Sequence, residues 1–464
     1  MAYKKDDRLN NFDVYPKVFV AGKESEIHIR PLGGRTLFQP DTEYKLVICA
    51  LDGGKPKDFP ATGDFRERMV KTDETGSFCF THTFDKEQAY YLRFFDDGKR
   101  VEQFPVYCVA EGLSGRYPFL GDLHMHTTLS DGRQTPEVVA ANYRKYGYDF
   151  TVISDHERYY PSIRAIEKYK DAPIEMAIIP GEEVHMPEVY GEYNDVHIVN
   201  FGGEFSVNAL VEGTQTAEVG RELSTRAIRT ENVPDVMTRE EYQATIHALA
   251  EKTETPEGVD VLPWTLCCWV FNQIRAGNGL GIFAHPNWIS NVFQVPEKFT
   301  DYMMEQQPFD AFEVLGGESY YEQNGFQTAR YYEERAKGRR FPIVGSTDSH
   351  SSYESNRNAF ICATIVFSPE NERKALIAAI KDFYSVAVDT ISAEFRLVGE
   401  ARFIRYGDYL LKNYFPLHDE LCYEEGRLMK QYVTGTQEER MEALAGIVFL
   451  SGRMKKLREK YFDF

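Results

Sequence analysis

The sequence has no long apolar run. Nowhere in its 464 residues is there a stretch near the roughly 18 to 20 consecutive apolar residues that a membrane-spanning helix needs. Its start, MAYKKDDRLNNFDVY, also lacks the apolar core of a secretory signal. We therefore expect no membrane partner and, if no leader precedes residue 1, a cytoplasmic location.

Cysteine is scarce and scattered. The seven cysteines are odd in number and show no C-x-x-C spacing, which is typical of reduced, mostly buried thiols rather than of a disulfide framework. This pattern also favours the cytoplasm.

Basic residues are outnumbered by acidic ones. With 53 Lys and Arg against 72 Asp and Glu, the formal net charge is -19, and such a chain repels polyanions at long range. Nucleic acid is therefore not an expected partner. A small pocket could still attract an anion, because bound divalent cations reverse the local field.

The placement of histidine points to chemistry. A His-x-His pair on an extended strand turns both rings to one face, and borderline metals need several imidazoles and carboxylates that converge from separate elements. Six of the eleven histidines stand at the ends of apolar, β-branched runs: His124, His126, His156, His197, His285 and His350. These predict a metal site. The others are expected to be ordinary: His28, His82, His185, His247 and His418.

The chain has two regions that differ in their pattern of apolar and turn-forming residues. Residues 1–113 alternate short β-like runs with turn clusters, which predicts an antiparallel β-sandwich that is either a structural or oligomerising appendage or a ligand-binding module. From Gly121 onward, strand-like runs such as FTVIS and GLGIFAHP alternate with helical patterns. One helix is predicted to begin after Thr135, with Pro136 at its first position, and to stop at Gly147.

The βα repetition predicts an α/β domain over residues 114–392. Its strands would form a parallel barrel or a related layered sheet, with catalytic groups at their carboxyl ends. Residues 203–278 depart from the repeat and are expected to be an insertion that forms a lid or a substrate wall. Residues 393–464 have apolar spacing near 3.6, which predicts a C-terminal helical extension packed on the outside.

Six short motifs occur in order along the chain: HMHTTLSDG, SDHE, PGEEV, DVHIV, AHP and STDSH. Together they resemble the PHP domain, the polymerase and histidinol phosphatase superfamily of metal-dependent phosphoesterases, in its SDG-type branch. The resemblance covers about Gly121 to Val388. It implies a distorted seven-stranded (β/α) TIM-like barrel of PHP type whose mouth holds up to three divalent metal ions.

The resemblance also implies a set of metal ligands, with one glutamate bridging the first two ions. The sets are His124, His126, Glu183 and Asp348 for the first ion, Glu183, His197 and His285 for the second, and Asp131, His156 and His350 for the third.

Asp131 stands where many members of the family have histidine. An oxygen ligand makes the third site harder, which tilts the expected ions from zinc toward manganese or iron. Glu182 and Glu183 are adjacent and face opposite ways on a strand, so only one can bridge, and the family's Gly-x-Glu pattern selects Glu183.

A cluster of this kind suits phosphate esters, whose negative charge repels a nucleophile. The predicted mechanism is in-line attack by a metal-bridging hydroxide at a di- or trinuclear site, with His156 or Asp348 as alternative acids that assist the leaving oxygen. Next to the metal motifs lie three candidates for phosphate contact: Arg133, Arg158 and Arg357.

Other residues near the motifs have open roles. Asn287 and Trp288 either line the pocket or pack within their loop, and Glu313 is expected to support a ligand or the fold.

The favoured function is metal-dependent hydrolysis of a small phosphorylated metabolite, by a phosphomonoesterase or phosphodiesterase. Two alternatives stay open: a metal-dependent hydrolase of a non-phosphate substrate, and a polymer-binding protein with a noncatalytic barrel. A polymerase-associated role is disfavoured by the charge of the chain. Histidinol phosphate is not preferred, because Asp131 and the long insertion differ from that branch. A homo-oligomer stays open.

Overall fold

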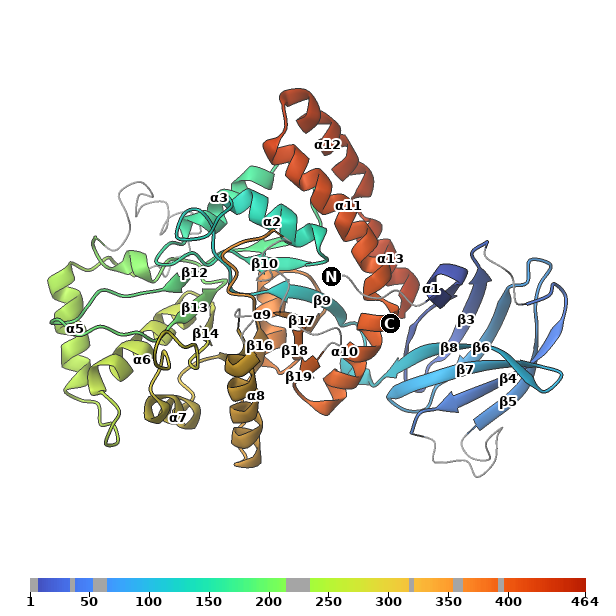
Figure 1. Ribbon diagram of the computed structural model, residues 1–464, viewed down its shortest axis with the longest axis horizontal. Coiled ribbons are helices and arrows are strands. Elements are labelled where there is room, and N and C mark those ends of the chain that lie inside the picture. The colour runs from blue at the N-terminus through green and yellow to red at the C-terminus, as the bar shows by residue number, and fades with distance from the viewer. Residues whose placement is uncertain are drawn as a thin grey trace. The chain divides into compact units, whose positions relative to one another are not determined.

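The computed structural model describes residues 7–33, 38–52, 65–213, 234–316, 321–353, 362–390 and 396–464. The chain forms two compact units, and Figure 1 labels their elements. Unit 1 comprises residues 1–117, 401–421 and 452–464, and unit 2 comprises residues 118–400 and 422–451. Both units together make a mixed α/β protein.

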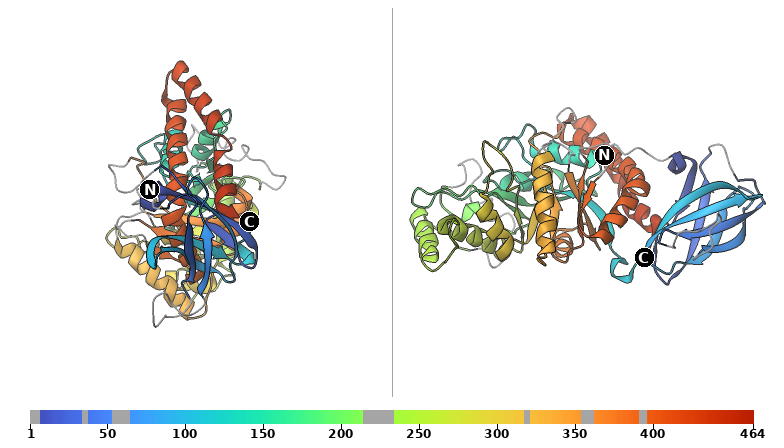
Figure 2. Two further views of the ribbon diagram at one scale, coloured as in Figure 1. Left: turned by 90° about the vertical axis from the view of Figure 1, so that its right-hand side faces the viewer. Right: turned by 60° about the horizontal axis from the view of Figure 1, so that its bottom comes forward.

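Unit 1 is built on two β-sheets, coloured mainly blue to cyan in Figures 1 and 2. A three-stranded antiparallel sheet has the order β1-β3-β6, and a six-stranded sheet has the order β20-β2-β8-β7-β4-β5. Burial alternates along β3, as expected for a strand with one face on a core. The strands are β1 Phe12–Tyr15, β2 Val18–Val20, β3 Glu24–Pro31, β4 Glu43–Ala50, β5 Phe65–Lys71, β6 Phe78–Thr83, β7 Gln88–Asp96, β8 Lys99–Val109 and β20 Phe462–Asp463.

Aromatic side chains from both sheets form the core of unit 1. The Phe38 ring lies 4.8 Å from that of Phe78 and 5.3 Å from that of Phe94, with edge-to-face geometry in both pairs. Phe12 adds a third such contact at 5.6 Å. Edge-to-face pairs stabilise a core beyond the area that they bury. The two sheets therefore enclose one hydrophobic centre.

The C-terminal helices are divided between the units. α10 (Ala401–Asn413) belongs to unit 1, where the Tyr406 ring stacks on Tyr107 at 4.9 Å, whereas α11 (Phe415–Thr434) continues from unit 1 into unit 2. The sequence predicts one outer extension over residues 393–464, and the structure divides it. Periodicity identifies an apolar helix face but does not specify the surface that covers it.

Unit 2 contains a six-stranded and a five-stranded sheet. Their orders are β11-β10-β9-β17-β18-β19 and β12-β13-β14-β15-β16. The pairs β9–β10, β10–β11, β14–β15 and β15–β16 are parallel. The strands are β9 Tyr117–Asp122, β10 Phe150–Val152, β11 Ala177–Ile179, β12 Gly181–Val184, β13 Ile198–Phe201, β14 Leu280–Phe283, β15 Ala311–Leu315, β16 Ile343–Gly345, β17 Cys362–Ser368, β18 Ser385–Asp389 and β19 Arg396–Val398.

The two sheets of unit 2 meet at isolated bridges. His156 pairs with Glu183, and Met125 pairs with Ser349, both in parallel orientation. By backbone strand pairing, the described residues form two open sheets and no closed barrel. The seven-stranded barrel expected from the sequence is therefore not shown. Both bridges involve residues of the predicted metal motifs or their immediate neighbours.

Helices cover the sheets of unit 2, and the helix predicted after Thr135 is present as α2. Pro136 is its first residue, and Gly147 follows its end with a φ of +98°. Every helix in the described ranges is too short or too polar to traverse a bilayer. α2 spans Pro136–Lys145. The other helical elements of unit 2 are α3 Tyr160–Tyr169, α5 Arg239–Ala250, α6 Val261–Ala276, α7 Glu297–Gln306, α8 Tyr321–Ala336, α9 Arg373–Lys381, α12 Gln437–Leu450 and η2 Asn208–Leu210, and those of unit 1 are α1 Asp7–Asn11, α13 Arg453–Tyr461 and η1 Glu111–Leu113.

The segment read as an insertion, residues 203–278, contains part of the core of unit 2. Trp264, Trp269 and Phe271 of α6 are buried there, and α6 leads directly into β14. α6 thus acts as a helix of the βα repeat. Residues 214–233 lie outside the described residues.

Candidate metal centre

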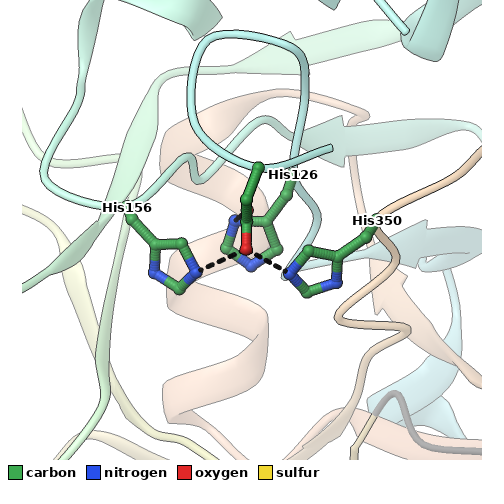
Figure 3. A group of neighbouring side chains, drawn as sticks. His126, His156 and His350 are labelled. Carbon is green, nitrogen blue, oxygen red and sulfur yellow. Dashed lines mark ion pairs between the residues drawn. The ribbon is translucent and has the colours of Figure 1, made fainter. Parts of the chain in front are cut away.

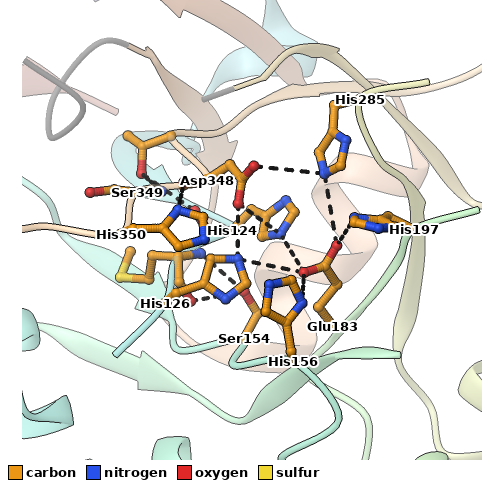
Figure 4. Close-up of polar contacts among 12 residues, drawn as sticks. His124, His126, Ser154, His156, Glu183, His197, His285, Asp348, Ser349 and His350 are labelled. Carbon is orange, nitrogen blue, oxygen red and sulfur yellow. Dashed lines mark hydrogen bonds and ion pairs between the residues drawn. The ribbon is translucent and has the colours of Figure 1, made fainter. Parts of the chain in front are cut away.

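The candidate metal centre lies where strands of unit 2 end, and Figure 4 shows its side chains directed toward one another. Short buried strands fix these positions, and the loops that follow them carry most of the polar side chains. His124 and His126 follow β9, His156 follows β10, Glu183 lies in β12, His197 precedes β13, His285 follows β14, and Asp348 and His350 follow β16.

Glu183 is the centre of this cluster. Its Oε1 lies 2.5 Å from Nδ1 of His197, and its Oε2 lies 2.7 Å from Nδ1 of His156. Glu182 faces the other side of the strand, where it accepts hydrogen bonds from Ser206 Oγ at 2.6 Å and from the backbone N–H of Val207. Three further imidazoles approach Glu183 through Nε2: His124 at 3.4 Å, His126 at 3.5 Å and His285 at 3.7 Å.

Asp348 joins the first imidazole pair from the opposite side. Its Oδ1 lies 2.9 Å from Nε2 of His126 and 3.4 Å from Nε2 of His124. Its Oδ2 lies 3.8 Å from Nε2 of His285. Both carboxylate oxygens therefore face imidazole nitrogens.

Asp131 forms a second focus with three imidazoles (Figure 3). Its Oδ2 lies 3.1 Å from Nε2 of His350 and 3.5 Å from Nε2 of His156, and its Oδ1 lies 3.8 Å from Nδ1 of His126. Partial burial acts to raise the pKa of Asp131. Hydrogen bonds with His156 and His350 outweigh that effect and hold the pKa well below its ordinary value.

The carboxylates and imidazoles of the cluster shift one another's pKa values. Burial works to raise the pKa of Glu183, but the imidazoles of His197, His124 and His156 outweigh it and lower that pKa. Burial likewise acts to lower the pKa of His124, yet the surrounding carboxylates raise it well above its ordinary value. For His197 burial prevails and lowers the pKa to about 4. The carboxylates thus stay ionised and attract positive charge.

Several buried polar atoms of the cluster lack a hydrogen-bond partner among the described residues. Buried polar atoms in native proteins are normally satisfied, so these need another partner. Imidazole nitrogens and carboxylate oxygens are ligands for zinc, manganese and iron. The donor set therefore fits divalent metal ions. The atoms are His124 Nε2, His126 Nδ1, His197 Nδ1, both ring nitrogens of His285 and both carboxylate oxygens of Glu183.

Three overlapping groups each bring ligand atoms within 4.8 Å of one another. The group of His124, His126 and Asp348 contains three residues of the first implied ligand set. The group of His126, Asp131, His156 and His350 contains all of the third set together with His126. The second implied set is connected by the contacts of Glu183 with His197 and His285. The groups are His124, His126 and Asp348; His124, His285 and Glu313; and His126, Asp131, His156 and His350.

Residues around the cluster orient its members. Glu313 Oε2 lies 3.0 Å from Nδ1 of His124, which leaves Nε2 of that ring directed at Glu183 and Asp348. A carboxylate on the far nitrogen fixes the tautomer and the ring plane of a metal-binding imidazole. Glu313 is expected from the sequence to support a ligand or the fold, and this contact shows that it supports His124.

The loop that carries Asp131 is tied down by its neighbours. Asp155 accepts hydrogen bonds from the backbone N–H and the hydroxyl of Thr127, both at 2.8 Å, and from Ser130 Oγ at 2.5 Å. A Cβ atom at Gly132 would lie 2.5 Å from the carbonyl oxygen of His126, so only glycine fits there. The SDG motif thus holds its carboxylate beside the imidazoles.

Backbone strain is concentrated at the cluster. Glu157, His285 and Asp348 have positive φ values of 59°, 21° and 45°. Residues other than glycine rarely adopt such values, and they persist at functional sites where the surroundings enforce them. Strain at two of the proposed ligands indicates that side-chain placement here prevails over local preference.

His185 is a residue of the site that sequence analysis assigned an ordinary role. Its Nε2 lies 2.9 Å from Nδ1 of His156 and 3.6 Å from Oε2 of Glu183. The signal was present in the sequence, because His185 follows Glu183 by two residues and a strand returns to the same face with that period.

The three arginine candidates for phosphate contact differ in their placement. Arg158 donates a hydrogen bond to the carbonyl of Leu129, so its guanidinium holds the loop before Asp131. Arg133 is exposed, and its backbone N–H donates to the carbonyl of His350. Arg357 lies outside the described residues. Asn287, two residues after His285, is buried.

Comparison with known proteins gives distant structural likenesses. No family model and no curated protein matches the chain. One similar structure is a two-domain protein from Bacteroides vulgatus, described as containing a predicted PHP-like metal-dependent phosphoesterase. It shows 14% identity and a TM-score of 0.36 over 59% of this chain and 65% of that one.

Two further solved structures resemble about half of the chain. One is described as a candidate metal-dependent phosphoesterase from Bifidobacterium adolescentis, with 17% identity over 50% of this chain and 87% of that one and a TM-score of 0.31. The other is an amidohydrolase from Chromobacterium violaceum with bound sulfate and no metal, with 16% identity, the same coverages and a TM-score of 0.31. PHP-like phosphoesterases are thus among the structural neighbours. The scores describe a remote likeness, so the case for this chain rests on its own residues.

Proposed function

We propose that this protein is a metal-dependent hydrolase of phosphate esters that acts on a small phosphorylated metabolite. One observation carries the proposal: nine histidine, aspartate and glutamate side chains from separate strand ends converge, with buried donor atoms directed at one another. Convergence of this kind is costly without cations, because buried carboxylates and imidazoles lose their hydration.

The ligands divide into three sets, as the resemblance to PHP domains implies, and the first two sets share Glu183. Manganese, iron or zinc would suit these mixed nitrogen and oxygen donors, with up to three ions in all. When bound, such ions supply hydroxide near neutral pH and neutralise charge on the phosphoryl oxygens. The two open sheets of unit 2 would then correspond to the distorted barrel of that family.

His156 and Asp348 are better placed to bind metal than to protonate a leaving group. The two nitrogens of His156 face the carboxylates of Glu183 and Asp131. Both oxygens of Asp348 face imidazoles. Each side chain has its polar atoms directed into the cluster, so we assign both as ligands and assign neither as the acid.

The proposed partners follow from the charge of the chain. A net charge of -19 disfavours nucleic acid, and we propose a small phosphorylated substrate, no membrane partner, and a cytoplasmic location. A homo-oligomer stays open within this proposal.

The experiment is phosphate release by metal-stripped protein reloaded with manganese, iron or zinc. Its substrates are a panel of phosphate monoesters and diesters. We expect hydrolysis that depends on added metal, and we expect Asp348→Asn to abolish it while the far-UV circular dichroism stays unchanged. Hydrolysis of a lactone or an amide with no phosphate release would instead support the non-phosphate alternative.

A further inference from the structure

A cavity of about 250 Å³ opens beside the metal cluster, and His185 belongs to both. Its Nε2 contacts His156 and Glu183, and the same residue lines the cavity. A substrate whose phosphoryl group lies on the metal ligands would therefore place its remaining part in this cavity. Glu157 and Arg239 line other parts of the wall.

The wall is held in place by the segment between β13 and α6. Asn208 is buried, accepts a hydrogen bond from the backbone N–H of His185 at 3.3 Å, and donates one to its carbonyl at 2.5 Å. The hydroxyl of Tyr242 in α5 donates to the carbonyl of Pro187 at 3.1 Å. These contacts fix His185 and the start of α5 relative to β12.

Arg239 is the first residue of α5. A capping box between Thr238 and Glu241 fixes that helix start. A guanidinium at a helix N-terminus gains nothing from the helix dipole, because that end carries partial positive charge. Arg239 is exposed at this helix start and lines the cavity, where its guanidinium can donate hydrogen bonds to a bound group.

The lining is polar and carries more acid than base. Glu157 and Glu188 contribute two carboxylates, and the hydroxyl of Tyr193 hydrogen-bonds to Glu188. Arg239 contributes one guanidinium and His185 one imidazole. Carboxylates accept hydrogen bonds from hydroxyl groups and repel phosphate, whereas the guanidinium donates hydrogen bonds. The described part of the cavity thus suits a neutral, hydroxyl-rich group.

The size of the cavity sets a further limit. Pockets for drug-sized ligands usually measure about 300 to 1,000 Å³. A cavity of about 250 Å³ lies below that range, so it suits a small group such as one sugar better than an extended polymer.

We infer that the substrate is the monophosphate ester of a small polyhydroxylated alcohol such as a single sugar. This inference rests on the proposed function. Hydrolysis breaks the bond between phosphorus and the alcohol oxygen, adds a water oxygen to phosphorus, and leaves a proton on the alcohol. Glu188 and Arg239 hold the hydroxyl groups and act as specificity residues, since neither is among the metal ligands.

The experiment compares four substrates on manganese-loaded protein: p-nitrophenyl phosphate, glycerol 1-phosphate, a hexose 6-phosphate and a hexose 1,6-bisphosphate. We expect kcat/KM for a polyol monophosphate to exceed that for the bisphosphate by at least about tenfold, because two carboxylates face the second phosphate. A preference for the bisphosphate, or for p-nitrophenyl phosphate, would overturn the inference.

Variants locate the preference in the cavity. Arg239→Ala and Glu188→Gln should each lower the ratio of kcat/KM for the polyol monophosphate to that for p-nitrophenyl phosphate by about tenfold, mainly through KM, as loss of a hydrogen bond to substrate predicts. Lys252→Ala is the matched control, because Lys252 is an exposed cation beyond the other end of α5. It should leave the ratio unchanged.

The outcomes separate the two proposals. If wild-type protein hydrolyses p-nitrophenyl phosphate but the ratio is equal in all variants, the cavity inference fails and the proposed function stands. If no ester in the panel is hydrolysed at any metal loading, the proposed function fails, and the inference about the substrate fails as well because it rests on that function.

Discussion

At the scale of single residues, the candidate site is built on buried carboxylates that face several imidazoles. Glu183 is fully buried, and its oxygens have five imidazoles of the proposed ligand set within 3.7 Å. Its neighbour Glu182 is also fully buried but is satisfied by hydrogen bonds, and burial raises its pKa to about 7. Two adjacent glutamates thus have different tasks.

A comparison of Glu183→Gln with Glu182→Gln should distinguish the proposed metal ligand from the hydrogen-bonded neighbour. Loss of the bridging charge is expected to lower metal-dependent kcat by roughly a thousandfold, about 4 kcal/mol of transition-state stabilisation, with little loss of fold. Glu182→Gln is the control and should retain metal-dependent turnover, because that side chain points away from the cluster. Steady-state kinetics with circular dichroism measures both. Equal losses in the two variants would contradict the assignment.

Lys17 makes the stability of unit 1 depend on pH. Burial lowers its pKa from 10.5 to about 8, although Asp13 acts in the opposite direction. Below pH 8 the ammonium is charged in the folded and in the unfolded state, so the full free-energy cost of burying the charge opposes folding. Between pH 8 and 10.5 the folded state releases the proton first, so that cost disappears as pH rises.

Lys17→Met is therefore expected to raise the free energy of unfolding at pH 7 by up to about 3 kcal/mol. The gain over wild type should shrink toward zero near pH 10.5. Urea unfolding at several pH values measures it, with Lys99→Met as an exposed control that should show no such trend. A variant less stable than wild type at pH 7 would show that the ammonium stabilises the fold.

At this scale, the convergence of the candidate ligands could largely be predicted from the sequence. Metal motifs stand at strand ends, and the period of a strand turns His124 and His126 to one face, so convergence followed from local pattern. Two roles did not follow. The role of His185 could not be predicted because its spatial neighbours were not known. The contact of Arg158 with a loop carbonyl could not be predicted because the direction of a long side chain depends on tertiary contacts.

At the scale of elements, α11 packs on α2 through a glycine. A Cβ atom at Gly426 would lie 2.1 Å from the backbone nitrogen of Lys145 and 2.7 Å from the carbonyl oxygen of Ala141. Arg144 of α2 lies at the same contact, where its guanidinium pairs with Glu425 at 2.5 Å. Backbone atoms cannot move aside as a flexible side chain does, so the helices would have to separate.

Gly426→Ala is expected to lower the free energy of unfolding by about 1 to 3 kcal/mol, or more if the helices cannot shift. Gly325→Ala in α8 is the matched control. A Cβ there meets nothing within 4 Å, so alanine should be neutral or stabilise the helix by up to about 1 kcal/mol. Thermal unfolding of both variants checks this, and similar midpoints would argue against close helix contact.

Helix existence was easier to predict than helix partners. Thr135 and Pro136 gave the start of α2, since capping and proline geometry are local. The spacing that predicted α10 and α11 specified apolar faces, yet it did not divide these helices between two units. An insertion was expected over residues 203–278 because that segment departs from the simple βα repeat. The apolar residues of α6 surround the helix, however, which is the pattern of a buried element.

At the scale of the whole molecule, the chain begins and ends in unit 1 and places the candidate metal centre in unit 2. A ligand that binds only the folded state stabilises the structure that it contacts. Added manganese should therefore increase hydrogen-exchange protection of β12 and of residues 346–351, and leave β4 and β7 of unit 1 unchanged. Exchange measured by mass spectrometry tests this. Equal protection in both units would contradict a site confined to unit 2.

Fold class followed from the sequence, but closure of the sheet did not. Alternating β and α patterns predicted a mixed α/β protein, and short strands in two open sheets, joined at His156 and Met125, are what the described residues form. Periodicity predicts the pairing of strands that are neighbours in sequence. Whether the first and last strands of a barrel pair depends on long-range contacts, which periodicity does not predict.

The most direct measurement is the metal content per chain after manganese is added to metal-stripped protein and excess ion is removed, determined by elemental mass spectrometry. The account predicts two to three ions per chain for the wild type, and loss of at least one in Glu183→Gln. Absence of bound metal in folded wild-type protein would contradict the claim that these buried carboxylates and imidazoles form a metal centre.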